Sequence, residues 1–418
     1  MPHKLPTGND TSARDDLAPS GRPITYAQAY LPRFQQHQEE LVQRLATLVN
    51  IASGSGHSEG VNQIMTHLEQ WLREIGCEVT LHPSEPYGCN LLARRRGKGK
   101  ARILLVGHVD TVYDPEAVQL QPFSTRDGLA FGPGVIDMKS GVLMGLYALR
   151  TLVESGFDEY AELCVIFNND EEVGSAGSAS LLREVAQQVE IGLVLEPSRA
   201  TEIITHARKG ADKYILEVTG VAAHSGAEPH RGRSAVIELA HKMIAIQNLH
   251  SIFPNVTFNV TRLSSSEPLN IVPDKARCHI SVRAYTQHGL DRAAAALEKI
   301  ATGSSIPDTH TTLTRIQGRQ PYEATPAVMQ LVQMAQVEGQ ALGLRMVSES
   351  KGGVSDANLL MGMGVPTLDS LGPVGGGMHN LSREHLRLDS IPVRGALLAG
   401  LIQRICLEKA IETESSNL

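Results

Sequence analysis

Several apolar segments of this chain end abruptly in residues that bind metal ions or protons. In chain order, these endings are His108 with Asp110 after residues 104–106, the acidic run 170–172 after residues 163–167, and Glu196 after residues 192–195. A strand buried on both faces has no reason to end in this way, whereas a strand that delivers a metal ligand does. Because open α/β sheets bind their ligands at the carboxyl ends of their strands, the endings predict one convergent site.

Two glycine-rich turns supply further candidates. Asp137 lies in residues 132–141 (GPGVIDMKSG), which open a predicted helix. A phosphate loop is a poor interpretation, since the spacing matches neither the dinucleotide nor the Walker pattern and an acid would repel phosphate. A carboxylate fixed at a tight turn is better suited to bridging two cations. His379 lies in residues 375–380 (GGGMHN), where an isolated histidine would more often be a surface residue.

Together these segments offer two imidazoles and three carboxylates, from His108, Asp137, Glu172, Glu196 and His379. This mixed set suits zinc, cobalt or manganese, and it has too much nitrogen for calcium or magnesium. If Asp137 bridges two ions, each ion receives one histidine, one glutamate and the shared aspartate. Within the acidic run, one glutamate would bind metal while the other accepts a proton from water. A solvated acidic turn is the alternative interpretation of that run.

Four motifs, taken in order, resemble those of the co-catalytic zinc aminopeptidase and carboxypeptidase family, which includes aminoacylase-1, succinyl-diaminopimelate desuccinylase and peptidase T. They are residues 107–112 (GHVDTV), 134–139 (GVIDMK), 170–175 (DEEVGS) and 195–197 (LEP). The resemblance implies two zinc ions per subunit, with cobalt or manganese as substitutes, and a cis peptide after Asp137. By this likeness one ion is bound by His108 and Glu196, the other by Glu172 and His379, and Asp137 bridges them. Glu171 would be the general base, and Asp110 would orient His108.

The later motifs resemble most closely the glutamate carboxypeptidases of the carboxypeptidase G type. They are residues 206–210 (HARKG), 222–226 (AAHSG), 269–273 (LNIVP), 318–319 (GR) and 351–357 (KGGVSDA). This likeness implies that the substrate is held by Lys209, Asn270, Arg319 and Gly353. It also implies that His224 reaches the site of a partner subunit and stabilises an oxyanion there. Asn270 could instead cap a turn, and Lys209 could be a solvated charge.

The elements that must position these residues alternate between helices and short apolar strands, which predicts an α/β fold. The pattern changes over residues 210–320, where the order β-α-β-β-α-β indicates a ferredoxin-like α+β unit. We therefore expect a discontinuous zinc-peptidase catalytic domain over 25–209 and 321–418, with a mixed, largely parallel sheet flanked by helices. Residues 210–320 would be an inserted dimerisation or lid domain, and residues 1–24 a disordered tail. The basic cluster 94–102 is expected to form a solvated hairpin turn.

Composition limits the partners of the chain. Its 418 residues are 42% hydrophobic and 20% charged, with a net charge of −7 and no basic block of the kind that binds nucleic acid. The five cysteines are scattered and odd in number, which favours a reducing compartment over a disulfide scaffold. With neither a secretory signal nor a membrane span in view, we expect a cytoplasmic protein that acts on a small molecule.

The expected function is hydrolysis of a peptide or N-acyl amide next to a free C-terminal carboxylate, with glutamate or a related amino acid at that end. The resemblance implies attack by a hydroxide held between the two metals, with Glu171 as general base. The substrate would be an N-acyl amino acid or a short peptide, and the enzyme a homodimer through residues 210–320. An aminoacylase or deacylase of the same family is the first alternative. A metal-free binding protein is a remote one.

Overall fold

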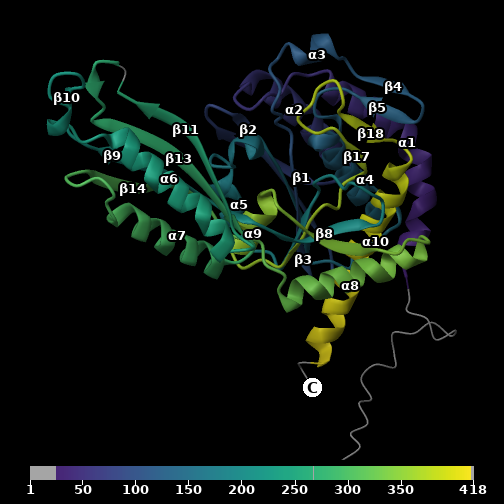
Figure 1. Cartoon of the computed structure of the whole chain (residues 1–418). Helices are drawn as coiled ribbons and strands as arrows, with labels where there is room; N and C mark the ends of the chain where they lie inside the picture. The colour runs from purple at the N-terminus through teal and green to yellow at the C-terminus, as the bar shows by residue number, and fades with distance from the viewer. Residues whose placement is uncertain (1–24, 267, 416–418) are drawn as a thin grey trace, which may run out of the picture.

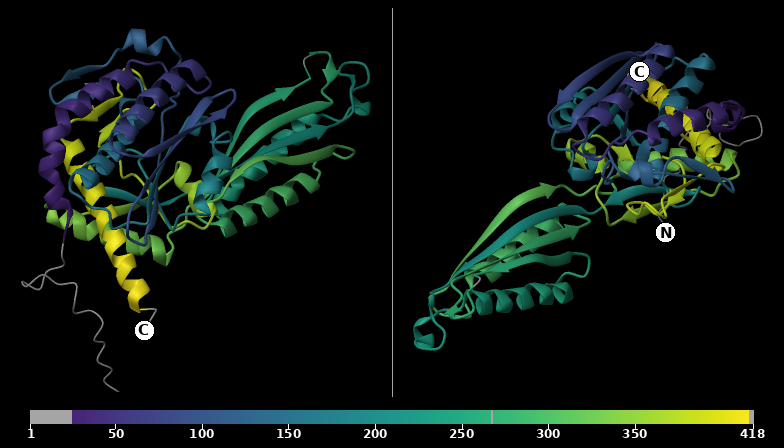
Figure 2. Two further views of the ribbon diagram at one scale, coloured as in Figure 1. Left: turned by 180° about the vertical axis from the view of Figure 1, so that it is seen from behind. Right: turned by 90° about the horizontal axis from the view of Figure 1, so that it is seen from above.

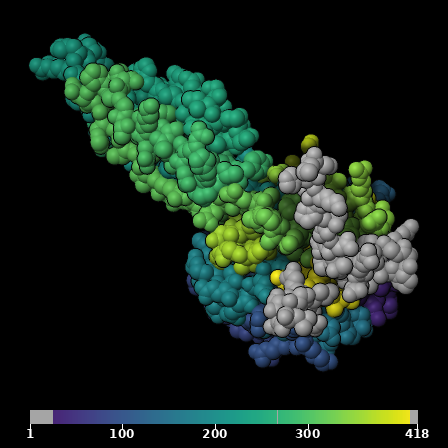
Figure 3. All heavy atoms as spheres, turned by 90° about the horizontal axis from the view of Figure 1, so that it is seen from below, coloured from purple at the N-terminus to yellow at the C-terminus, as the bar shows by residue number. Residues whose placement is uncertain are grey.

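The protein has a broad main body from which an elongated lobe projects (Figures 1 and 2). A computed structural model describes residues 25–266 and 268–415. The lobe is built from residues 210–319 and the main body from the chain on either side of it. The tail expected over residues 1–24 lies outside the described residues. The space-filling view in Figure 3 shows how far the lobe extends beyond the main body.

A mixed six-stranded sheet forms the centre of the main body. Its strands, in spatial order, are β1 (Glu78–Ser84), β2 (Gly88–Arg96), β6 (Glu162–Asn168), β3 (Arg102–His108), β7 (Ile191–Val194) and β16 (Thr367–Leu368). The last four run parallel to one another, while β1 and β2 are antiparallel additions at one edge. This arrangement confirms the predicted α/β class with a mixed, largely parallel sheet. The hairpin turn expected for the basic cluster 94–102 is wrong, because β6 lies between β2 and β3.

Helices cover both faces of this sheet, which explains why its central strands β6, β3 and β7 are almost uniformly apolar. One face packs against α1 (Ala27–Val49), α2 (Ser58–Glu74), α4 (Ser140–Glu154) and α10 (Ser390–Ser415). The other packs against α5 (Ala179–Ala186), α9 (Asp356–Gly362) and the start of α8 (Pro326–Ala341). Successive residues of β3 alternate between the two cores, with Leu105 on the first side and Leu104 on the second. Each such buried leucine contributes roughly 1.5–3 kcal/mol of transfer free energy.

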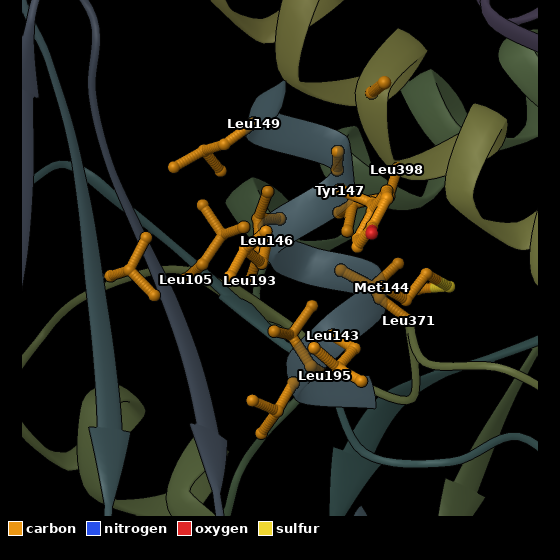
Figure 4. Close-up of a cluster of buried hydrophobic side chains, with 14 of the residues drawn as sticks. Leu105, Leu143, Met144, Leu146, Tyr147, Leu149, Leu193, Leu195, Leu371 and Leu398 are labelled. Atoms are coloured by element: carbon orange, nitrogen blue, oxygen red, sulfur yellow. The ribbon is translucent and has the colours of Figure 1, made fainter. Parts of the chain in front are cut away.

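Helix α4 is the central helix of the first core. Figure 4 shows its Leu146 directed toward Leu105 and Leu193 of the sheet, while Tyr147 on another face of the helix lies beside Leu398 of α10. Helix α10 contains a segment, Ser390–Lys409, that is long and apolar enough to cross a membrane. That segment is 83% buried, so α10 is a core helix of this fold.

Shorter elements complete the main body. They are α3 (Ala117–Leu120), the antiparallel strands β4 (Ser124–Arg126), β5 (Leu129–Phe131), β17 (Gly375–Gly376) and β18 (His385–Arg387), and the parallel pair β8 (Ile203–Arg208) and β15 (Val347–Lys351). The loop between β17 and β18 carries His379, so this small sheet positions one of the candidate ligands.

The lobe has a hydrophobic core of its own. Its antiparallel sheet has the order β11 (Thr257–Ser265), β13 (Lys275–Ala284), β9 (Gly210–Thr219) and β14 (His310–Arg319). One face of this sheet is covered by α6 (Ala235–Ile252) and α7 (Gln287–Thr302), through residues such as Leu216, Ile280 and Leu297. The chain order β9-α6-β11-β13-α7-β14 is that of the split βαβ motif. A two-stranded ribbon, β10 (Ala223–His224) with β12 (Ile271–Val272), lies at the far tip of the lobe (Figure 1).

Candidate active site

The candidate metal ligands come from separate elements that meet at the carboxyl edge of the central sheet. His108 is the last residue of β3, and Glu196 follows β7 after one residue. Glu172 lies in the loop after β6, Asp137 in the turn that precedes α4, and His379 in the loop between β17 and β18. The sequence separation of these residues is large, and the parallel strand order brings their side chains together at one edge.

Asp137 lies between the two histidines. Its Oδ1 is 3.3 Å from Nε2 of His108, and its Oδ2 is 3.3 Å from Nε2 of His379. Glu196 Oε1 lies 3.8 Å from the same nitrogen of His108, and Glu172 Oε2 lies 3.4 Å from that of His379. Each oxygen of Asp137 therefore belongs to a separate group of one imidazole and one glutamate. This donor set fits two cations that share Asp137.

The electrostatics of the cluster favour cations as well. Burial and the Asp137 carboxylate raise the pKa of Glu196 to about 8, and burial raises the pKa of Glu172 to about 7. Burial lowers the pKa of His108, but its hydrogen bonds to Asp110 and Asp137 outweigh this and raise the pKa well above its usual value. The buried carboxylates repel one another, and without metal they must take up protons to reduce this repulsion. Bound divalent cations would neutralise the same negative charge.

Glu171 lies beside the cluster and faces the same space. Its side chain is 11% exposed, and one of its oxygens lies within 4.8 Å of ligand atoms of His108 and Glu196. Burial raises the pKa of Glu171 well above its usual value, and the Glu196 carboxylate adds to the rise. A carboxyl group with a raised pKa can both accept and return a proton near neutral pH. This is the property that a general base in amide hydrolysis requires.

Asp110 holds the loop that carries Glu171. Its Oδ1 accepts a hydrogen bond from the backbone N–H of Glu171 at 3.1 Å, and its Oδ2 accepts one from that of Glu172 at 3.1 Å. His108 Nδ1 is 3.0 Å from the backbone carbonyl of Asp110 and 3.4 Å from its Oδ1. Asp110 thus orients His108 chiefly through its backbone oxygen, while its carboxylate fixes the two glutamates.

Arg319 fixes the same loop from the lobe side. Its guanidinium donates to the carbonyl of Gly174 at 2.7 Å, to Ser175 Oγ at 3.1 Å and to the carbonyl of Ser355 at 3.3 Å. One of its nitrogens also lies 3.7 Å from Glu171 Oε1. Most of its donors are therefore engaged by the protein. The predicted contact of Arg319 with a substrate carboxylate remains a prediction, and the structure adds a role in holding the Glu171 loop.

A cavity of about 950 Å³ opens directly onto this cluster. Asp137, Glu171, Glu172, Glu196 and His379 all line it. Its other walls carry six cations, Arg199, Arg208, Lys213, Arg283, Arg319 and Lys351. Such a pocket attracts anionic groups and places them next to the metal ligands.

The exposed face of the lobe sheet forms one wall of this pocket. Ala211 pairs with both Arg283 and Arg319, and Lys213 pairs with Gln317, so these side chains project from one face of adjacent strands. Arg283 donates to the carbonyl of Gly352 at 3.0 Å. Lys213 is exposed in this wall. These two cations are therefore well placed to receive an anionic group.

The other predicted substrate residues divide into two groups. Gly353 lines the pocket, and its carbonyl accepts a hydrogen bond from Arg208 at 3.2 Å. Lys209 does not line it, because its ammonium lies over the ring of Tyr285, 5.2 Å from the ring centroid. Asn270 is exposed at the far tip of the lobe, where its carbonyl accepts the N–H of Ser225 at 2.9 Å.

His224 lies at the same tip, in β10, and does not line the pocket of its own chain. Its Nδ1 accepts hydrogen bonds from the N–H groups of Gly226 and Ala227 at 3.1 and 3.0 Å. The proton of the neutral ring therefore lies on Nε2, which points a donor away from the turn. Within one chain, then, the structure separates His224 from the residues that it was predicted to assist.

Sequence reasoning missed several residues of the pocket. Lys213 left a signal, since β9 alternates polar and apolar residues, but nothing in that alternation shows which surface its polar face meets. Arg208 and Lys351 lie within the motifs 206–210 and 351–357, where neither was assigned a role, and they are held by buried partners, Asp369 at 2.5 Å and Ser370 at 2.8 Å respectively. These partners lie 161 and 19 residues away in the sequence, so no local pattern reveals them.

Comparisons with known proteins identify the family of this chain. The model of peptidase family M20/M25/M40 matches residues 104–404. The chain is 32% identical to carboxypeptidase G2 of a Pseudomonas species, over 87% of this chain and 89% of that protein. It is 28% identical to succinyl-diaminopimelate desuccinylase of Xanthomonas oryzae, over 75% and 86% of the two chains.

The fold has close relatives among solved structures. Aminopeptidase PepT from Bacillus cereus superposes with a TM-score of 0.75 at 23% identity, covering 88% of this chain and 98% of that one. The family match includes His108, Asp137, the 170–172 loop and Glu196, the same segments that form the cluster. The chain therefore belongs to peptidase family M20/M25/M40 and is a metal-dependent hydrolase.

Proposed function

We propose that this enzyme hydrolyses an amide bond next to a free carboxylate, with glutamate or a related acidic residue on the carboxylate side. The observation that carries the proposal is the joining of the metal-ligand cluster and a cation-lined cavity in one pocket. A substrate carboxylate bound by the cations would place the neighbouring amide against the cluster. Carboxypeptidase G2, the 32% identical relative, supports a carboxypeptidase-type reaction.

We infer that two zinc ions are held by His108 with Glu196 and by His379 with Glu172, with Asp137 shared between them. When bound, such ions polarise the amide carbonyl and make water more acidic. Cobalt or manganese would fit the same nitrogen and oxygen donors. Asp110 keeps His108 in place through its backbone carbonyl, and its carboxylate holds the backbone of Glu171 and Glu172.

Glu171 performs the proton transfers in this proposal. It accepts a proton from the attacking water and returns it to the amide nitrogen as the bond to the carbonyl carbon breaks. Its burial raises the pKa, so the Glu171 carboxylate is a stronger base toward the proton of the attacking water than an exposed glutamate would be. Arg319, 3.7 Å away, holds the loop so that the carboxylate stays directed at the pocket.

The substrate carboxylates are assigned to the pocket wall on the lobe. Arg283 presents a guanidinium that can bind a carboxylate through two parallel hydrogen bonds, and Lys213 presents an ammonium one row farther along the same face. Two cations in the same cavity as the cluster fit an amino acid that has both a main-chain and a side-chain carboxylate. This is why glutamate or a close relative is the favoured residue.

His224 requires a second copy of the chain. Its position at the tip of the lobe, with Nε2 free to donate, suits an oxyanion in the pocket of a partner subunit. We therefore propose a homodimer in which each lobe supplies His224 to the other site. Asn270, beside it on the same ribbon, would enter that site together with His224.

A deacylase that removes an acyl group from an amino acid is the second candidate. The relation to succinyl-diaminopimelate desuccinylase favours it, because that protein is named for removal of a succinyl group. The two candidates share every residue of the metal cluster, so only the pocket distinguishes them.

A substrate panel tests the proposed acidic specificity and metal dependence. One acyl group is attached in turn to glutamate, glutamine and lysine, and the resulting amides are compared with N-acetyl-methionine, each with zinc-loaded and chelator-treated enzyme. The proposal expects the highest kcat/KM with glutamate and loss of activity after metal removal. Faster turnover of the lysine or methionine compound than of the glutamate compound would reject the acidic specificity. Full activity in thoroughly metal-free enzyme would reject the metal-dependent mechanism.

A further inference from the structure

Glu384 is a fully buried acid that lies close to the metal cluster but is not a member of it. It is 0% exposed and ends the loop between β17 and β18, five residues after His379. Burying a carboxylate is costly unless several hydrogen bonds compensate, so a fully buried one indicates a specific structural task.

The partners of Glu384 identify that task. Its Oε1 accepts hydrogen bonds from the backbone N–H groups of Ile136 and Asp137, at 3.1 and 3.3 Å. Its Oε2 accepts one from the N–H of Gly134 at 3.3 Å and one from the hydroxyl of Tyr113 at 2.6 Å. One carboxylate therefore binds three backbone groups of the turn that carries the shared ligand Asp137.

The same loop carries His379 on its other side. Within it, Asn380 and Arg383 form successive turns, and the N–H of Glu384 donates to the carbonyl of Asn380 at 2.8 Å. His379 itself has little support from packing, since its side chain is 56% exposed, whereas His108 is 1% exposed. The position of His379 relative to Asp137 thus depends on how this loop is attached to the 134–137 turn.

We propose that Glu384 is a positioning residue that sets the separation between His379 and Asp137. It would thereby control the affinity of the cation position formed by Asp137, Glu172 and His379. The position formed by His108 and Glu196 also shares Asp137, but these two ligands lie at strand ends of the central sheet, so this position depends less on Glu384. This inference rests on the two-cation centre proposed above, and it adds a residue that binds neither metal nor substrate.

The test is zinc binding by the full-length protein, measured by competition with a chromophoric chelator after metal removal. In Glu384→Gln an amide N–H₂ replaces one acceptor oxygen and cannot accept the N–H of Gly134. We expect one of the two zinc affinities to fall about 10- to 100-fold, as for other residues that orient ligands, and the other to fall less because the two positions share Asp137. Tyr113→Phe removes a single donor and should weaken the same position by less than tenfold.

Glu338→Gln is the matched control. Glu338 is also 0% exposed and accepts two backbone N–H groups, from Tyr26 at 2.9 Å and Ala27 at 2.7 Å, but it lies in α8, outside the metal cluster. It should lower the melting temperature and leave both zinc affinities intact. Two unchanged affinities in Glu384→Gln and Tyr113→Phe, with two ions bound by the wild type, would overturn the role of Glu384 alone. A wild type that binds fewer than two ions would instead overturn the two-cation centre and this inference with it.

Discussion

Glu171 and Glu172 are neighbours in sequence with different environments. Glu172 faces His379 at 3.4 Å, whereas Glu171 faces the pocket and Arg319. We therefore expect Glu171→Gln to lower kcat by about 10²- to 10⁴-fold, the usual contribution of a positioned proton-transfer group. Zinc content, measured by elemental analysis, should remain at two ions per chain. Substantial residual turnover with a full metal complement would remove Glu171 from the proposed role.

Lys213 tests the acidic specificity of the pocket. A charge-assisted hydrogen bond contributes about 1.5–3 kcal/mol, which corresponds to roughly a tenfold or larger change in affinity. Lys213→Met should therefore raise KM for an N-acyl glutamate at least tenfold and leave the glutamine analogue little affected. Lys299→Met, on the exposed surface of α7 in the same lobe, is the control and should change neither. Equal losses for both substrates would show that Lys213 does not bind the second carboxylate.

The sequence could reveal a site residue only when its neighbours in the chain mark it as unusual. A residue whose role depends on hydrogen bonds to distant segments stays hidden. His108, Asp137, Glu172 and Glu196 interrupt apolar runs or turns, so their unusual settings are visible in the chain itself. Glu384 follows an ordinary polar loop, and the hydrogen-bond partners of its carboxylate lie 247 to 271 residues earlier. A role made of contacts with distant backbone groups and a distant hydroxyl leaves no pattern in the sequence.

At the scale of elements, the site depends on a close approach of α4 to the strand end that bears Glu196. A Cβ atom at Gly141 would lie 2.3 Å from the backbone oxygen of Leu195, whereas one at Gly145 would lie 2.5 Å from the movable Cδ1 of the same residue. Gly141→Ala must therefore displace backbone next to a metal ligand, while Gly145→Ala need only displace a side chain.

These two substitutions form a matched pair. Overpacking of this kind costs about 1–3 kcal/mol, so both variants should unfold at lower denaturant concentration than the wild type. Only Gly141→Ala should also weaken zinc binding, because Glu196 follows Leu195 directly. If the variants lose zinc affinity equally, the packing of α4 affects the site through general loosening and not through the backbone at Leu195.

Element types were easier to predict than element neighbours. The alternation of polar and apolar residues in β9 and β13 gave the lobe sheet and its buried face. The insertion of β6 between β2 and β3 could not be read in this way, because strand order is set by how helices cover the sheet rather than by the strands' own residues. The hairpin turn expected for residues 94–102 was wrong for that reason.

At the scale of the whole molecule, the lobe carries candidate functional residues at both of its ends. Arg319 and Lys213, at its base, face the pocket of their own chain. His224 lies in β10 at the tip of the lobe, away from that pocket, and Asn270 directly precedes its partner strand β12 (Figure 1). In the homodimer proposed above, this ribbon would act in the site of the other copy.

The activity of a mixed dimer shows which chain supplies His224 to a given site. Glu171→Gln and His224→Ala chains are co-expressed with different tags, and the mixed dimer is purified through both. If His224 acts across the dimer, one of its two sites has both residues, and the dimer should show about half of wild-type activity. If His224 acts within its own chain, neither site is complete and the mixed dimer should be nearly inactive.

The reverse pairing makes the result independent of general damage by the substitutions. A wild-type chain is paired with a chain that carries both changes. Action across the dimer then leaves the wild-type site without His224 and the other site without Glu171, so activity should fall about 10²- to 10³-fold, as after loss of an oxyanion donor. Action within the chain leaves one complete site and about half of the activity. The two pairings contain the same substitutions in the same number, so only the arrangement of His224 relative to Glu171 can separate them.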